Sequence, residues 1–364
     1  MNYILLGDVI ATAKVERCGE NDLPVLSITK SDGIVLQSEK FKKRIASKDT
    51  ADYKVVHRGQ LVQGIHIDEA NFGIQEVVDA GIVSPAYKIW NITSNMIVPR
   101  YLEIVLRSPR SIAYYASKFN GSIKRRERLS DKDFLDMRIP CPPIKMQIHS
   151  IETLDKVASL ISHRKQQLTE LDNLIKARFV EMFGDPVSNP MGWGTKRFDA
   201  LCENLDSRRK PITASEREAG IYPYYGASGI VDYVADYLFD EDILLVSEDG
   251  ANLLMRSTPI AFSVSGKVWV NNHAHVVRFE EMSMQKYIEV FFSMIDISEH
   301  ITGSAQPKLN QAKLNAMMFP VPDNDRLEAF LSFVKQTDKS KAAVQKALDE
   351  AQTLFDSLMQ QYFG

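Results

Sequence analysis

Several residues of this chain have types and spacings that could support chemistry. The candidates are Cys141 in "IPCPP", Asn189 and Pro190 in "SNPM", the acidic group Asp240, Asp242, Glu248 and Asp249, and the histidines His273 and His275. A cysteine beside proline could present a thiolate nucleophile, and an Asn-Pro pair could hold an amino group for methyl transfer. Clustered carboxylates or histidines could bind a divalent metal ion. Each possibility has to be weighed against a purely structural role.

These candidates do not assemble into a catalytic motif. Cys141 aligns with Val321 in a second Pro-X-Pro sequence, which favours an apolar packing role. "SNPM" is one proline short of the Asn-Pro-Pro-aromatic motif of amino-methyltransferases, and no glycine-rich loop follows a strand as a cofactor site would require. No lysine follows Glu248 at nuclease spacing, so a strand flanked by acidic turns is the better interpretation. His273 and His275 are expected on a strand, one side chain inward and one outward, and they form no paired metal motif. The sequence therefore predicts no catalytic residue, metal or cofactor in this chain.

Bulk properties describe an ordinary globular protein. A chain of 364 residues suits two domains, and 45% apolar and 25% charged residues are typical values. The net charge of −3 means that any nucleic-acid surface must be local. Three scattered cysteines argue against a disulfide framework. No apolar run approaches the roughly 18 residues of a membrane span, and the start lacks a signal-peptide pattern, so we expect a cytoplasmic protein without membrane contact.

The sequence repeats itself at a distance of 180 residues, the separation of Gly184 from Gly364. Without a gap, "LSDKDFLDMRIPCPP" falls on "LNQAKLNAMMFPVPD", and both copies end in Phe-Gly. Slightly upstream, "GSIKRRERL" in the first half corresponds to "GSAQPKL" in the second, with a shift of two residues. Each half therefore has the same plan: a mixed region, a Gly-Ser loop, a Pro-X-Pro turn and a long helical pattern.

Heptad spacing of apolar residues predicts that the two helical patterns are coiled-coil helices of about 38 residues, or about 57 Å. The predicted seam is formed by Leu154, Val157, Ile161, Leu168, Leu171, Ile175, Val344, Leu348, Phe355 and Leu358. Each helix is too long to bury its stripe against one domain, so antiparallel pairing of the two helices is expected. Ordinary core packing is the alternative for a single copy.

The remaining regions are expected to be mixed, with strands in "YKVVHRGQLVQGIHI" and "YPYYGASGIVDYV" and short helices before each Gly-Ser loop. The predicted fold class is α+β, with two globular recognition domains separated by two long antiparallel coiled-coil helices in a pseudo-two-fold repeat. The expected segments are a first domain at 1–145, a first spacer helix at 146–184, a second domain at 185–324 and a second spacer helix at 325–364.

Local basic and small residues are the candidates for DNA contact, because phosphates attract Lys and Arg and base edges are read by polar side chains. The predicted DNA-binding residues are Lys30, Ser31, Lys42, Lys43, Arg44, Ser122, Lys124, Arg125, Arg126, Arg208, Arg209, Tyr225, Gly226, Ser228, Ser304, Gln306 and Lys308. A solvated surface remains the alternative for "EKFKKR", and a plain turn remains the alternative for "YYGASG".

Three sequences together resemble the specificity subunits of type I restriction–modification systems. They are "MFGDPVSNPMGW" after a long helix, "YPYYGASGIVDYV" in the second half, and "GSAQPKLNQAKLNAMMFPVP" before the last helix. The resemblance extends over essentially the whole chain and includes the two-copy design. The first half departs from it, with "DLPVLSITKSDGIV" where the second half has "IYPYYGASGIVDY".

The resemblance implies a non-catalytic subunit that reads a bipartite site in double-stranded DNA with one domain per half-site. It also implies that the helices bind two methyltransferase subunits, which carry S-adenosylmethionine, and that restriction subunits join through them. Two other classes stay open: a coiled-coil adaptor without DNA contact, and a stand-alone DNA methyltransferase.

Overall fold

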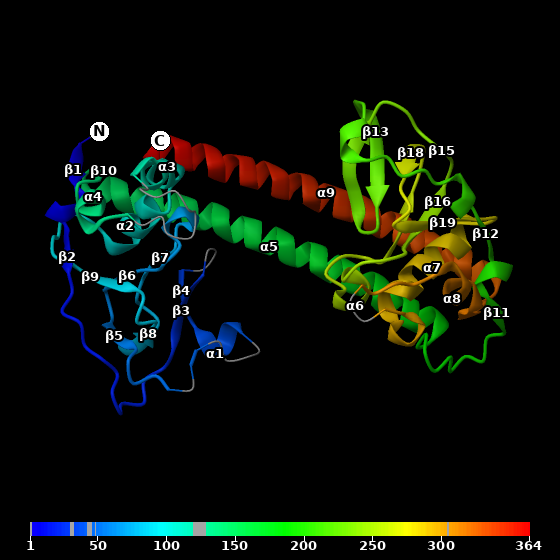
Figure 1. Cartoon of the computed structure of the whole chain (residues 1–364), viewed down its shortest axis with the longest axis horizontal. Helices are drawn as coiled ribbons and strands as arrows, with labels where there is room; N and C mark the ends of the chain where they lie inside the picture. The colour runs from blue at the N-terminus through cyan, green and yellow to red at the C-terminus, as the bar shows by residue number, and fades with distance from the viewer. Residues whose placement is uncertain (1, 30–32, 42–45, 48, 119–128, 304–305) are drawn as a thin grey trace. The chain divides into compact units, whose positions relative to one another are not determined.

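The computed structural model describes residues 2–29, 33–41, 46–47, 49–118, 129–303 and 306–364. The chain forms two compact units, Met1–Arg164 with Ala347–Gly364, and Lys165–Lys346 (Figure 1). Each unit contains one end of each long helix, α5 (Ile144–Phe183) and α9 (Asn324–Phe363). The expected mixture of helices and sheets, with a repeated long helix, is confirmed.

The first unit contains small sheets covered by short helices. Its strands are β1 (Tyr3–Leu5), β2 (Ile10–Thr12), β3 (Leu26–Thr29), β4 (Gly33–Leu36), β5 (Lys54–His57), β6 (Leu61–Gln63), β7 (Phe72–Ile74), β8 (Ala80–Val83), β9 (Lys88–Ile92) and β10 (Arg138–Pro140). Its short helices are η1 (Leu6–Asp8), α1 (Gln37–Lys40), η2 (Ile67–Glu69), α2 (Pro99–Leu106), α3 (Pro109–Lys118) and α4 (Asp131–Leu135).

The strands of the second unit follow the same order as those of the first, with different short helices between some of them. Its strands are β11 (Thr195–Arg197), β12 (Cys202–Asn204), β13 (Ala219–Gly226), β14 (Gly229–Val234), β15 (Phe239–Asp240), β16 (Ile243–Ser247), β17 (Ala261–Val264), β18 (Lys267–Val270), β19 (Ala274–Phe279) and β20 (Met318–Pro320). Its short helices are η4 (Phe198–Ala200), η5 (Asp206–Arg208), η6 (Ala214–Glu216), α6 (Asn252–Met255), α7 (Met282–Met294), η7 (Ser298–His300) and α8 (Gln311–Ala316).

The sheets of the two units have the same topology. A four-stranded antiparallel sheet has the order β2-β9-β6-β7 in the first unit and β12-β19-β16-β17 in the second. The second unit adds a sheet of order β14-β13-β18-β15, in which β13 and β18 are parallel. The first unit has the corresponding hairpin β3-β4 and pair β5-β8, with a parallel bridge from Val25 to Ile82. The half that departs in sequence therefore still forms the equivalent hairpin.

The link from sheet to long helix is duplicated bond for bond. β1 pairs antiparallel with β10, and β11 pairs antiparallel with β20. The amide of Leu6 donates to the carbonyl of Met137 at 2.8 Å, and in the second unit Phe198 donates to Met317 at 2.9 Å. Each Pro-X-Pro turn then leads into its long helix. The repeat found in the sequence is thus a repeat of structure.

Aromatic side chains fill both cores. In the first unit Phe72 stacks on Phe134 at 5.6 Å, beside the buried Trp90, and Phe363 of α9 contacts Tyr101. In the second unit the equivalent Phe183 of α5 packs against Tyr287 and Phe330. Each Phe-Gly therefore ends a helix by burying its phenyl ring. Gly184 follows with φ +81°, a left-handed conformation that favours glycine.

One helical pattern differs from its expected form. The sequence "RYLEIVLRSPRSIAYYASKF" reads as one helical pattern, but the structure has two helices, α2 and α3, that meet at Ser108 and Pro109. Proline lacks an amide hydrogen and its ring clashes with the preceding turn, so Pro109 begins a new helix instead of continuing the old one.

Candidate nucleic-acid interface

The C-terminal end of β16 is the point at which polar segments of the second unit meet. The strand consists of five buried residues, Ile243–Ser247, and its neighbours in the sheet are β19 and β17. The Ser247 hydroxyl donates to the carbonyl of Ala227, in the turn between β13 and β14. The carbonyl of the next residue, Glu248, accepts from the amide of Leu309 at 2.8 Å. The strand end is therefore tied both to the hairpin turn and to the segment that follows the Gly-Ser loop.

Two cations share the carboxylate of Glu248. The guanidinium of Arg209 lies 2.6 Å from it, and the ammonium of Lys308 lies 3.1 Å from it. Burial alone raises the pKa of Glu248, but hydrogen bonds from Arg209 and Lys308 and the nearby His275 charge outweigh it, so this pKa lies below its ordinary value. Glu248 is a charged link between two segments that are far apart in sequence.

His275 is buried beneath this pair, with 1% of its side chain exposed. Its Nδ1 lies 2.6 Å from the Asp206 carboxylate, and its Nε2 lies 2.8 Å from the carbonyl oxygen of Leu309. The Leu309 carbonyl oxygen can only accept, so Nε2 donates to it, and Nδ1 faces the carboxylate. Burial raises the pKa of Asp206, but the contacts with His275, the hydrogen bond from the Val276 amide and the charge of Arg209 together lower this pKa below its ordinary value.

Asp206, Glu248 and His275 are the side chains that converge in the way a metal site would require, within the described part of the chain. Both carboxylates are already paired with the cations Arg209 and Lys308. A divalent cation would have to displace these cations and break the contacts that both ring nitrogens of His275 make. The geometry therefore supports a structural ion network better than a metal centre.

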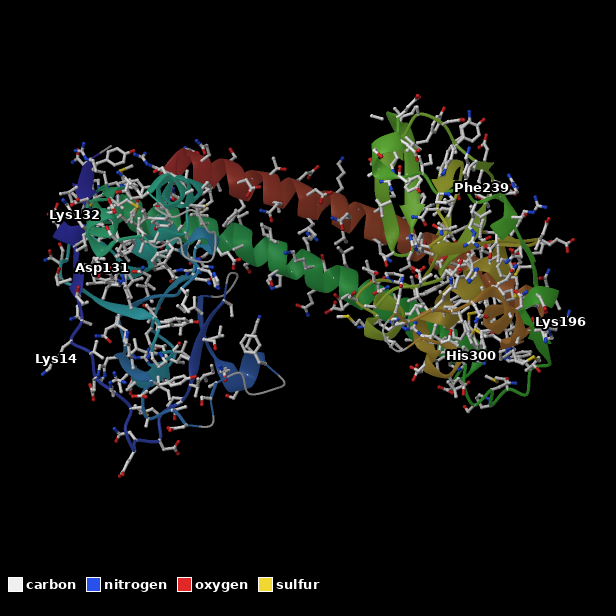
Figure 2. The ribbon with its side chains drawn as sticks, in the orientation of Figure 1. Lys14, Asp131, Lys132, Lys196, Phe239 and His300 are labelled. Atoms are coloured by element: carbon white, nitrogen blue, oxygen red, sulfur yellow. The ribbon has the colours of Figure 1, made fainter. Side chains whose placement is uncertain are left out.

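The adjacent arginines of "SRRK" belong to different networks. Arg209 is buried among Asp206, Glu248 and the carbonyl of Ala274. Arg208 instead pairs with Glu241 at 2.7 Å and lies 4.6 Å above the ring of Phe239, the residue labelled in Figure 2. Of these two predicted DNA-binding residues, Arg209 therefore has a structural role, because its guanidinium is held by groups of the second unit.

Lys308 is positioned by a short backbone network. Its amide and carbonyl pair with Thr302, and the Gly250 amide donates to the Pro307 carbonyl at 3.0 Å. Its side chain stays 49% exposed although its ammonium contacts Glu248. Gln306 is exposed on the same segment. Both predicted residues are therefore displayed on the surface beside the end of β16.

The "YYGASG" sequence forms a hairpin turn, as the sequence predicts for a turn between two strands. Gly226 pairs with Gly229, so Ala227 and Ser228 form the two-residue turn. Tyr225 is half-buried against Phe262, with ring centroids 6.0 Å apart. Gly226 and Ser228 thus lie at the hairpin end that Ser247 anchors. The structure brings this turn, Arg209 and Lys308 into one region.

Ten of the predicted DNA-binding residues lie outside the described residues. They are Lys30, Ser31, Lys42, Lys43, Arg44, Ser122, Lys124, Arg125, Arg126 and Ser304. Lys30 and Ser31 fall between β3 and β4 in sequence, the position that corresponds to the β13–β14 turn.

The predicted seam residues lie on the inward side of the long helices. Leu154, Val157 and Ile175 are buried, whereas the others, Ile161, Leu168, Leu171, Val344, Leu348, Phe355 and Leu358, are half-buried. In the first unit Leu154 belongs to the core cluster with Met359 of α9. In the second unit the ammonium of Lys341 lies 2.6 Å from Asp172. Within each unit the two helix ends therefore run antiparallel.

The sequence interpretation missed the residues that organise this region. The sequence predicts a strand at His275 and a strand flanked by acidic turns at Glu248, and it gives no role to Asp206. His273 lies in a turn before β19, where it contacts Asp249 at 2.9 Å. His275 and Asp206 are 69 positions apart, so no local pattern could pair them. One histidine is buried and the other exposed, as expected, but the reason is that His273 lies outside the strand, since residues two apart on a strand share a face.

Among the described residues, no helix is both long and apolar enough to cross a bilayer.

Comparison with known proteins gives consistent matches. Residues 190–352 match the family described as type I restriction modification DNA specificity domain. The chain is 34% identical over 127 residues to a Haemophilus influenzae protein named as a type I restriction enzyme specificity subunit. That match covers 35% of this chain and 32% of the relative, so the chain spans about a third of the length of the curated relative that it matches.

Solved structures share the fold over the whole chain. The S subunit of a type I restriction-modification system from M. genitalium aligns with a TM-score of 0.60 and 12% identity, covering 100% of this chain and 96% of that one. A chain from a study of complex assembly and conformational transition of the type I R-M system aligns with a TM-score of 0.55 and 13% identity, covering 100% and 97%. At such identities the likeness concerns the fold alone.

Proposed function

We propose that this chain is a specificity subunit of a type I restriction–modification system and that it reads a bipartite DNA site, since residues 190–352 match the DNA specificity domain of that family. Each unit recognises one half-site in double-stranded DNA. The long helices bind two methyltransferase subunits, and restriction subunits join through these in the cytoplasm. S-adenosylmethionine binds to the partner methyltransferases, and this subunit does no chemistry itself.

The observation that carries this proposal is the duplication of one fold within one chain. Both units have the same order of strands in the main sheet, and both have the same hydrogen-bonded link to a 40-residue helix. A repeated reading domain suits a site with two separate parts, and a repeated helix suits two copies of one partner. The loops that differ between the units are where different bases can be read.

The second unit offers a surface that suits DNA. The anchored hairpin turn, the exposed Lys308 and the exposed Gln306 gather at the end of β16. Lysine can contact a phosphate, glutamine can read a base edge, and a turn of small residues allows close approach. The buried ion network of Arg209, Glu248 and His275 holds these segments in place.

The proposal can be tested with the full chain co-expressed with the methyltransferase of its own system. The complex is incubated with a library of random duplexes, and bound DNA is separated by mobility shift and sequenced. We expect enrichment of one sequence in two parts with a fixed gap. The methyltransferase alone is the control and should enrich no sequence.

The other two function classes predict different outcomes. A coiled-coil adaptor would bind the methyltransferase without adding any DNA preference. A stand-alone methyltransferase would bind S-adenosylmethionine and modify DNA as the isolated chain. Calorimetry with S-adenosylmethionine and the isolated chain is therefore expected to show no stoichiometric binding, and a clear binding isotherm would contradict the proposal.

A further inference from the structure

The β13–β14 hairpin carries an unusual pair of neighbouring exposed aliphatic residues. Ile230 is 47% exposed and Val231 is 57% exposed, directly after the two-residue turn. In a regular strand successive side chains point to opposite faces. Two adjacent β-branched residues exposed together therefore require a local reason.

A β-bulge supplies this reason. Tyr224 pairs with Asp232 whereas Tyr225 pairs with Ile230, so Val231 is an extra residue in β14. A bulge breaks the alternation and redirects side chains, and bulges are common beside functional sites. Gly226 leaves room for the Val231 side chain, because a Cβ at position 226 would lie only 3.1 Å from a methyl group of Val231.

The end of the hairpin has the size and charge that approach to DNA requires. Its turn is formed by the small residues Ala227 and Ser228. The one charged residue between Ala219 and Val234 is Asp232, and Arg217 pairs with it at 3.1 Å. The hairpin therefore presents no unpaired negative charge to the phosphate backbone.

The groove can be assigned from dimensions. The major groove is about 12 Å wide and admits a two-stranded β-ribbon without deformation of the DNA, whereas the minor groove of B-DNA is only about 6 Å wide. The only apolar group on base edges in the major groove is the 5-methyl group of thymine. Exposed aliphatic side chains on a ribbon can pack against that methyl group, but they cannot bind the hydrogen-bond donors and acceptors of the base edges.

We propose that the turn end of the β13–β14 hairpin enters the major groove of the half-site read by the second unit, where Ile230 and Val231 contact thymine methyl groups. This proposal rests on the proposed function and names the bases that the second unit distinguishes. The half-site is then expected to contain at least one A·T pair whose thymine methyl contributes to binding.

The test replaces each thymine of that half-site by uracil, which removes only the methyl group. The full chain in complex with its methyltransferase is titrated with duplexes of the preferred sequence. At one or two positions uracil should weaken binding by about fourfold, the factor for one buried methyl-sized group. In the Ile230→Ala and Val231→Ala variants, thymine and uracil duplexes should bind equally at the position that each residue contacts.

Ile221→Ala is the matched control, since Ile221 is 78% exposed near the other end of the same hairpin. This variant should keep the full difference between thymine and uracil. Two results with the wild-type protein would overturn the proposal: a half-site that contains no A·T pair, or equal binding of thymine and uracil duplexes at every position. A difference that persists in both alanine variants would overturn it too.

Failure of the proposed function looks different from failure of this inference. A complex that enriches no DNA sequence removes the basis for any half-site. A complex that enriches a bipartite sequence but ignores thymine methyl groups retains the function and loses only the contact assigned here.

Discussion

At the scale of single residues, the second unit uses its charged groups in pairs. Arg209 and Lys308 were predicted to bind DNA because they are basic, yet both contact Glu248. They differ in exposure: the Arg209 side chain is 13% exposed and that of Lys308 is 49% exposed. Lys308 is therefore the residue of the two that is exposed enough to contact a phosphate.

We predict that Lys308→Ala weakens DNA binding and lowers the slope of log K against log salt by about one, because one phosphate contact and its released counterion are lost. The measurement is a titration of the complex at several salt concentrations. Lys196→Ala, at an exposed position in β11, is the control and should leave the slope unchanged. An unchanged slope for Lys308→Ala would show that its ammonium does not contact phosphate.

The carboxylates of Asp206 and Glu248 make stability depend on pH. The ordinary pKa is 3.8 for Asp and 4.5 for Glu, and in the folded protein the pKa of each of these two carboxyl groups lies below that value. A depressed pKa contributes stability that is fully present above the ordinary value and is lost as pH falls through the folded value. We therefore predict that unfolding becomes easier as pH decreases below about 4.5.

Thermal unfolding followed by tryptophan fluorescence from pH 7 to pH 3 measures this effect. The Asp206→Asn and Glu248→Gln variants should be less stable at neutral pH and should lose less stability on acidification. Glu218→Gln, at an exposed position, should behave like the wild type. Parallel acid profiles for all four proteins would mean that the buried network does not control the acid response.

At the scale of elements, the two long helices contact each other within each unit. Lys341 of α9 contacts Asp172 of α5, and nearer their ends Phe330 lies 5.7 Å from Phe179. Because the repeat shift is 180 residues, Gln166 of α5 corresponds to Lys346 of α9. These positions lie next to the boundaries of the compact units, so changes there leave both cores untouched.

Inserting four residues after Gln166 is predicted to change the preferred gap between half-sites, if the helices act as a spacer. Four residues add about 6 Å of helix and about 40° of rotation, and DNA rises about 3.4 Å per base pair. The gap should grow by one or two base pairs, with some loss of stability because the heptad seam shifts. Methylation of plasmids with variable gaps measures the preference.

A second variant with four residues inserted after both Gln166 and Lys346 is the matched design, because it keeps the two helices equal in length. It should show the same longer gap with less loss of stability. If both variants methylate only the original spacing with undiminished efficiency, the helices do not determine the gap.

At the scale of the whole molecule, one fold is used twice in one chain. We predict that replacing residues 1–145 by the matching region of a relative changes only one half of the recognised sequence, because each unit has its own core and its own sheets. Methylome sequencing of cells expressing the exchange variant measures both halves. The unexchanged chain is the control, and alteration of both halves would contradict independent reading.

The sequence by itself determined the duplicated plan. Two Phe-Gly ends, two Pro-X-Pro turns and two heptad stripes follow from local periodicity and from comparison of one half with the other. The hairpin in "YPYYGASGIVDYV" was also predictable, because small and glycine residues between β-rich runs form a turn. These features depend on residues that are close in sequence, or on repetition that can be read directly.

Only the tertiary structure decided which side chains act together. Arg208 and Arg209 are neighbours in sequence but pair with Glu241 and Glu248, which lie on different strand ends. His275 is held by Asp206 and the Leu309 carbonyl, through contacts between segments far apart in the chain. The exposure of Ile230 and Val231 depends on a bulge set by pairing with β13. Such partners are chosen by packing of distant segments, which no local pattern encodes.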